Sequence, residues 1–189
     1  MNQLLELISA SVIGAFILLI AIALNMQISD SSREIFESSH NQSNVITASY
    51  VIEYDLYKAG NRVTGEKVIS ADSNSVSFKT DLDNNGSIDT VQYFTGNPAE
   101  LNTTPNPNDK QLFRKINNQN PNLVSIVTKF NLVYYDSIGN ILNNSLLINP
   151  SERNKIKGIM VYVKTELPDE IKDQYNPLEW RKTIRPKNL

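Results

Sequence analysis

The chain has 189 residues, with 20 Asp and Glu against 18 Lys and Arg and a formal net charge of −2. This balance argues against nucleic acid as a partner, because no surplus of basic residues is available to neutralise phosphates. The absence of cysteine excludes a disulfide framework, a thiolate zinc site and a cysteine nucleophile. After an apolar amino-terminal segment, about 160 residues remain, which is the size of one domain.

The amino-terminal segment Leu4 to Met26 is long and apolar. As a helix it extends for roughly 34 Å, which exceeds the roughly 30 Å hydrocarbon core of a bilayer. A core helix would show a polar stripe, whereas Val12 to Leu24 is apolar on every face. A cleavable signal peptide needs a basic start, and no basic residue precedes Arg33. We therefore expect a membrane-inserting helix, with a retained signal sequence and a core helix as the alternatives.

Glu6 is the one acid in this segment. A carboxylate near the end of a membrane helix is costly and usually has a partner or a function. In one interpretation Glu6 lies among the lipid headgroups, in the first turn of the helix, where the helix dipole favours an acid. In the other it pairs with a positive group, such as the amino terminus of a neighbouring copy.

The helix is expected to continue beyond the membrane. Residues 28–59 contain no Pro or Gly, although Ser31 with Glu34 resembles a capping box and would permit a break near 29–32. Gly60 is the expected C-cap. One apolar stripe follows the helical period near the end of this stretch, at Val45, Ala48, Ile52, Leu56 and Ala59, with Ile46, Tyr50 and Tyr57 beside it.

The pattern LLELISASVIGAFILLIAIALN resembles the amino-terminal helix of type IV pilins and type II secretion pseudopilins, and YDLYKAG is similar to the end of that helix in minor pilins. If Asn2 is the mature first residue, Glu6 is the fifth, where the family's acid helps to recruit subunits to a filament. The basic leader ending in Gly, at which the prepilin peptidase cuts, does not precede Met1. The chain is therefore either the mature form with Met1 added or kept, or not processed in that way.

The resemblance implies a minor pilin or pseudopilin, a structural protein rather than an enzyme. It implies a single pass through the bacterial inner membrane, with the carboxy-terminal domain periplasmic or extracellular and later part of a cell-surface filament. The implied partners are other pilin or pseudopilin subunits, inner-membrane lipid before assembly and the assembly platform protein. The alternative is a signal-anchored calcium-binding or adhesive β-domain. The sequence does not distinguish a pilus subunit from a secretion pseudopilin, or a subunit at the filament tip from one in the shaft.

After Gly60 the apolar residues repeat with a period of two, in short segments rich in β-branched and aromatic residues, which is typical of strands. A long helix followed by strands predicts an α+β fold with an antiparallel sheet packed on the helix, which is the pilin-like lollipop. Three parts are expected along the chain. Residues 1–28 form the transmembrane and assembly half of the helix, residues 29–60 form its amphipathic second half, and residues 61–189 form the strand-rich domain. Strands are expected at Glu66–Ser70, Ser75–Thr80, Ile88–Phe94, Gln111–Ile116, Phe130–Tyr135, Ile156–Lys164 and Arg181–Arg185. By resemblance, Leu123–Tyr135 also belongs to the sheet.

The sharpest chemical motif is the segment from Asp81 to Asp89, DLDNNGSID. Oxygen ligands at alternate residues around a Gly turn are typical of a Ca²⁺ loop. The position of the final bidentate Glu holds Gln92, and the flanks read as strands, so the motif is not an EF-hand. It predicts either a β-hairpin that binds Ca²⁺ or a turn formed for backbone reasons alone. The candidate ligands are Asp81, Asp83, Asn85, Ser87 and Asp89.

The sequence offers little support for catalysis. His40 is the only histidine and is expected to be solvated, because no second His or Cys can complete a metal or nucleophilic site. There is no phosphate-binding Gly loop and no Gly-x-Ser-x-Gly elbow.

Overall fold

The computed structural model describes residues 2–101, 104, 106–167 and 177–189. It confirms the α+β class, with one long amino-terminal helix and antiparallel strands. The chain forms two compact units, one that ends at His40 and one that runs from Asn41 to Leu189. The last turns of the long helix therefore belong to the same unit as the strands.

The long helix is α1, Asn2–Lys58. It is uninterrupted at 29–32, so Ser31 and Glu34 do not break it. In its first 28 residues the large apolar side chains are between 49% and 70% exposed. The first turn of α1 contains no acidic residue, because the helix begins at Asn2 and Glu6 lies just beyond that turn. The interpretation that places Glu6 in the first turn is therefore corrected.

From Asn41 onward, one face of α1 is buried and the opposite face is exposed. The predicted stripe is confirmed, since all of its members are at most 4% exposed: Val45, Ala48, Ile52, Leu56 and Ala59. Tyr50, 69% exposed, and Tyr57, 46% exposed, lie outside the core. Burial thus follows the 3.6-residue period that the sequence predicted.

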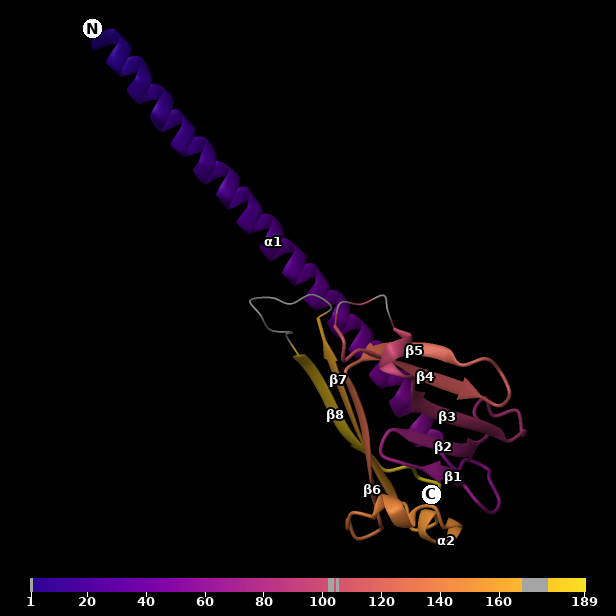
Figure 1. Ribbon diagram of the computed structural model, residues 1–189. Helices are drawn as coiled ribbons and strands as arrows, with labels where there is room; N and C mark the ends of the chain where they lie inside the picture. Colours follow the sequence, from indigo (N-terminus) through magenta and orange to yellow (C-terminus); the bar gives the residue numbers. More distant parts are fainter. Residues whose placement is uncertain (1, 102–103, 105, 168–176) are drawn as a thin grey trace. The chain divides into compact units, whose positions relative to one another are not determined.

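Within the described residues, eight strands form two antiparallel sheets (Figure 1). The five-stranded sheet has the order β1-β2-β3-β4-β5, in which each strand pairs with its neighbour in sequence, and the three-stranded sheet has the order β6-β7-β8. The strands of the first sheet are β1 Val68–Ala71, β2 Ser75–Thr80, β3 Asp89–Thr95, β4 Lys110–Ile116 and β5 Asn122–Val127. Those of the second are β6 Lys129–Tyr135, β7 Gly158–Glu166 and β8 Pro177–Ile184. Short helices occur at η1 Pro98–Glu100, η2 Asn144–Leu146 and α2 Pro150–Arg153.

The predicted strands all occur, β2 with the predicted bounds and the others with shifted ends, but the single expected sheet is two sheets. The run Leu123–Tyr135 is divided at Thr128 into β5 and β6, which belong to different sheets. The backbone N–H of Thr128 donates to the carbonyl of Lys164 in β7 over 2.8 Å, so the chain crosses from one sheet to the other at this residue. Local strand preference does not encode such a change of partner.

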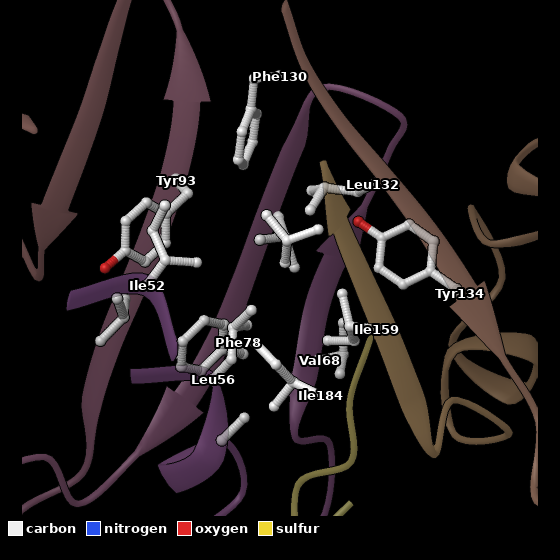
Figure 2. Packing of buried hydrophobic residues seen from close by; sticks show 14 of the residues in the cluster. Ile52, Leu56, Val68, Phe78, Tyr93, Phe130, Leu132, Tyr134, Ile159 and Ile184 are labelled. Carbon is white, nitrogen blue, oxygen red and sulfur yellow. The ribbon is translucent and has the colours of Figure 1, made fainter. Parts of the chain in front are cut away.

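The core lies where the end of α1 and both sheets meet (Figure 2). Ile52 and Leu56 come from the helix, Phe78 and Tyr93 from the five-stranded sheet, and Ile159 from the three-stranded sheet. Each of these residues is at most 1% exposed. Because all three elements bury side chains in the same cluster, neither sheet has a separate core.

A buried charged cluster lies beside this core. Asp55 of α1 is fully buried and accepts two hydrogen bonds from Arg114 of β4, 2.6 Å from Nε to Oδ2 and 3.0 Å from Nη2 to Oδ1. The Tyr93 hydroxyl of β3 donates to the same Oδ2 over 2.6 Å. Burial, and then the charge of Asp55, raise the pKa of Tyr93, so its phenol stays protonated and acts as a donor. The cluster joins the helix to two adjacent strands.

The end of α1 is fixed by hydrogen bonds with β2. The N–H of Gly60 donates to the carbonyl of Lys79 over 2.9 Å, and the Thr80 hydroxyl donates to the carbonyl of Lys58 over 2.6 Å. Gly60 has a φ of +79°, as expected of a helix-ending glycine. A Cβ at this position would lie 2.7 Å from the carbonyl oxygen of Asn188. Both the backbone angle and the space therefore require glycine.

Replacing Asp55 by Ala should lower the free energy of unfolding by about 3 to 5 kcal/mol, because it leaves the Arg114 guanidinium without its buried counter-charge. The control is Glu53→Ala, which breaks a solvent-exposed ion pair with Lys182 and should cost less than about 1 kcal/mol. Chemical denaturation of both variants measures the difference. Equal losses would contradict the role of Asp55.

Replacing Gly60 by Ala should lower stability more than replacing Gly65 by Ala. Both residues have positive φ, which costs an L-residue about 1 to 2 kcal/mol. Only Gly60 has backbone atoms where the new methyl group would lie, whereas no atom lies within 4 Å of a Cβ at Gly65. The measurement is the thermal unfolding midpoint of each variant, and an equal decrease would show that the space beside Gly60 is not limiting.

Candidate functional site

The first candidate is the apolar part of α1, which is long and apolar enough to cross a membrane. The hydroxyls of Ser9 and Ser11 donate to the carbonyls of Leu5 and Ile8, each over 2.8 Å. Both serines therefore satisfy their hydrogen-bonding groups within the helix, as a lipid environment requires. The carboxylate of Glu6 cannot be satisfied in this way, because it and the helix carbonyls are both acceptors. Glu6 is exposed, and in lipid its carboxylate needs a hydrogen-bond donor or a positive partner.

The second candidate is the hairpin formed by β2 and β3. Its loop contains four of the predicted metal ligands, and the fifth, Asp89, is the first residue of β3. The buried member of the set is Asp81, whose side chain is 0% exposed. Asp81 Oδ2 accepts from Nη1 of Arg62 over 2.8 Å and from the N–H of Gly86 over 3.1 Å. Burial acts to raise the pKa of Asp81, but these hydrogen bonds and the charge of Arg62 outweigh it and hold the pKa below its usual value. The folded loop therefore contains an ionised, buried carboxylate.

The second oxygen of this carboxylate is unusual. Asp81 Oδ1 is buried and lacks a hydrogen-bond partner among the described residues. Most buried polar atoms in proteins are hydrogen-bonded, and an unpaired carboxylate oxygen is a place where a water molecule or a cation is expected. This oxygen belongs to the first ligand of the predicted Ca²⁺ motif, and it is the observation in this loop that most favours a bound ion.

Three of the other predicted ligands already accept hydrogen bonds, Asp83 and Asn85 within the loop and Asp89 partly from outside it. Asp83 accepts from the backbone and the side-chain nitrogens of Asn85, at 3.2 and 2.8 Å, and Asn85 Oδ1 accepts from the N–H of Ser87 over 2.7 Å. Asp89 accepts from Asn117 over 2.8 Å and from the N–H of Leu82 over 3.3 Å. In the part of the chain that the structure describes, no group of three His, Cys, Asp or Glu residues is placed to hold a metal ion. Ca²⁺ would therefore have to displace some of these donors.

The residues that follow α1 were not predicted to belong to this loop. Asn61 Nδ2 donates to the carbonyl of Asp81 over 3.2 Å, and Arg62 Nη1 lies 3.3 Å from the carbonyl of Asn84. Arg62 and Asn84 both adopt positive φ, at 55° and 62°. An Asn next to a Gly at the helix end was the available signal for an unusual backbone, but the pairing across about twenty residues depends on the tertiary fold.

A hollow of about 460 Å³ lies beside the edge strand β1. Ser70, Asp72, Asn144 and Arg153 are among its lining residues. The guanidinium of Arg153 is engaged with the carbonyls of Val68, Leu147 and Ile148 and with Glu66. It therefore stabilises the loop that covers β1 and is not presented to a ligand.

His40 is exposed and its ring lies 6.5 Å from that of Phe36 on the same helix.

If the 81–89 loop binds Ca²⁺, millimolar Ca²⁺ should raise the thermal unfolding midpoint relative to chelator, because a ligand of the folded state stabilises it by mass action. Asp83→Asn should remove most of this rise, since it deletes one charged ligand. Asp136→Asn is the matched control, because Asp136 also accepts from the backbone of its own turn, at Ile138 and Asn140, but lies outside the motif. A midpoint that does not respond to Ca²⁺ would make the loop purely structural.

Comparison with known proteins returned no matching family model, no matching curated protein and no matching solved structure.

Proposed function

We propose that this chain is a structural minor subunit, a minor pilin or pseudopilin, of a type IV pilus or type II secretion filament. The observation that carries the proposal is α1, which is a single helix from Asn2 to Lys58. Its first part exposes apolar side chains on every face, and its last part buries one stripe under the sheets. A membrane anchor alone does not require a helix that enters the folded domain.

The proposed mechanism is associative. In the membrane the apolar half of α1 is solvated by lipid, and in a filament it exchanges lipid for neighbouring helices through close packing. Glu6 adds a requirement for a positive partner, because an unpaired carboxylate in an apolar bundle is strongly destabilising. A neighbour in the wrong register would leave this charge unpaired, so Glu6 selects the register.

The partners follow from this mechanism. They are other pilin or pseudopilin subunits, inner-membrane lipid before assembly and the assembly platform protein. The chain would cross the bacterial inner membrane once, with its strand-rich unit outside the cytoplasm, and later lie in a cell-surface filament. In this role it binds and positions other subunits and is not an enzyme.

The alternative is a signal-anchored module whose β-domain binds calcium or adheres to a surface. In such a module a flexible linker would join anchor and domain at Ser29–Asn44. That stretch is helical throughout, which favours the filament subunit. The feature that favours the alternative is the buried, unpartnered Oδ1 of Asp81 in the predicted Ca²⁺ loop.

Replacing Glu6 by Gln or Ala should leave the protein in the membrane but reduce its crosslinking to partner subunits at least severalfold, because the register-selecting charge is lost. The readout is crosslinked product and assembled filament in cells that express each variant at equal level. Glu37→Gln is the control, since it removes an acid of the same helix that pairs with Arg33 and lies outside the apolar segment. Assembly of the Glu6 variants at the level of the unmodified protein would reject the proposed role.

A further inference from the structure

Lys164, Glu166 and Asn106 meet at a place that the proposed filament role does not use. Lys164 and Glu166 are two residues apart at the end of β7, so they share one face of the strand, and Asn106 lies in the loop before β4. Nζ of Lys164 lies 2.6 Å from Oε1 of Glu166, and Nδ2 of Asn106 donates to Oε2 over 2.9 Å. One carboxylate therefore holds an amine and a carboxamide at its two oxygens.

The carbonyl end of the same carboxamide is also held. The backbone N–H of Asn108 donates to Oδ1 of Asn106 over 3.0 Å. A backbone donor on a carbonyl oxygen is the arrangement that stabilises the tetrahedral intermediate of acyl transfer. Asn106 is 2% exposed and the side chain of Glu166 is 12% exposed, so little water reaches the carbonyl carbon. The amide is thus polarised and shielded from hydrolysis.

The resting site is an ammonium–carboxylate ion pair, so a proton must move from Lys164 to Glu166 before Nζ can attack. The hydrogen bond with Glu166 is the main cause that raises the pKa of Lys164, so the resting amine is an ammonium ion without a free electron pair. Burial acts to raise the pKa of Glu166, but the hydrogen bonds from Lys164 and Asn106 outweigh it and keep the group ionised. Glu166 is therefore in the form that can accept a proton from Lys164, and it already touches the nitrogen that would leave.

We propose that Lys164 and Asn106 become joined by an intramolecular amide bond, with Glu166 as the proton carrier. Glu166 takes a proton from the Lys164 ammonium, and the free electron pair of Nζ attacks Cγ of Asn106. The negative charge on Oδ1 is stabilised by the N–H of Asn108. The Cγ–Nδ2 bond then breaks as Glu166 passes protons from Nζ to Nδ2, and the nitrogen leaves as ammonium. Glu166 ends as the carboxylate that it was at the start, and no oxidant or cofactor is consumed.

The bond would join the two sheets. Asn106 precedes β4 of the five-stranded sheet, and Lys164 belongs to β7 of the three-stranded sheet. A chain without cysteine cannot tie its sheets together with a disulfide. A covalent bond between these residues restricts the unfolded chain as a disulfide does, and it resists separation of the sheets under tension. The inference concerns the unit Asn41–Leu189 and is independent of the proposed function.

The test is the intact mass of the full chain purified in mild detergent, followed by tryptic peptide mapping. The expected result is a mass lower than that of the sequence by one ammonia, together with a branched peptide in which Lys164 is uncleaved and linked to the peptide that contains Asn106. The branched peptide is required, because ring closure at Asn85–Gly86 would also release ammonia. A mass equal to that of the sequence, or a loss that maps elsewhere, would overturn the proposal. The three side chains would then be joined only by hydrogen bonds and an ion pair.

Three variants assign the roles. Lys164→Arg keeps the positive partner of Glu166 but removes the nucleophile, so its mass should show no loss at this site and its thermal midpoint should fall. Glu166→Gln should slow formation of the bond by about 100-fold or more, which is the usual range for a general acid–base group. Lys129→Arg is the matched control, because Lys129 lies opposite Lys164 in the pairing of β6 and β7 but takes no part in the proposed reaction. This substitution should leave the bond intact. Formation of the bond at an unchanged rate in Glu166→Gln would contradict the role of Glu166.

Discussion

The ion pair between Asp55 and Arg114, completed by the Tyr93 hydroxyl, sets the position of the last turns of α1 against the five-stranded sheet. Tyr93 and Arg114 lie directly opposite each other on β3 and β4, so the sheet presents one site with three donor groups. A slip of the helix by one turn would move Asp55 by about 5.4 Å and break all of these bonds. Apolar contacts are not directional, so the stripe on either side of Asp55 does not by itself fix how far the helix extends along the sheet. The buried carboxylate does fix it, because its charge must remain paired.

A second set of contacts holds the helix end at the hairpin that contains the predicted metal motif. Lys58 Nζ donates to the carbonyl of Leu82 over 2.6 Å, and the Arg62 guanidinium binds Asp81. The N–H of Asp81 in turn donates to the carbonyl of Asn61 over 3.0 Å. The acidic loop is therefore part of the attachment of α1, whether or not it also holds an ion. This explains why Asp81 is buried in a loop whose other acids remain accessible.

The two halves of α1 place different requirements on one helix. Apart from Glu6, the large side chains of the membrane-length segment near the amino terminus are apolar and lie on every face of the helix. Residues after Asn41 must fit one packed core and present the opposite face to solvent, which restricts apolar side chains mainly to one stripe. In the proposed filament the first half provides association and the second half transmits load to the sheets. The seam at Asn106, Glu166 and Lys164, where the two sheets meet, is where resistance to such load would matter most.

Much of the fold was predictable from local pattern. The membrane-length segment, the stripe from Val45 to Ala59, the turn at Gly60 and the strands each depend on periodicity or backbone preference within a short window. The sequence also located the hairpin at 81–89, because the Asn-Gly turn lies between two clear strand patterns. These features need no knowledge of distant residues.

The tertiary structure decided which residues meet. No local pattern pairs Asp55 with Arg114 or Arg62 with Asp81, and none indicates that Leu123–Tyr135 changes sheets at Thr128. Lys164, Glu166 and Asn106 gave no signal in the sequence, since each is an ordinary polar residue near a loop or strand end. What the sequence by itself determined was each element and its buried face, because those depend on neighbours along the chain. The contacts of Asp55 with Arg114, of Arg62 with Asp81 and of Asn106 with Glu166 join residues far apart in sequence, and only the packing of helix and sheets brings them within hydrogen-bonding distance.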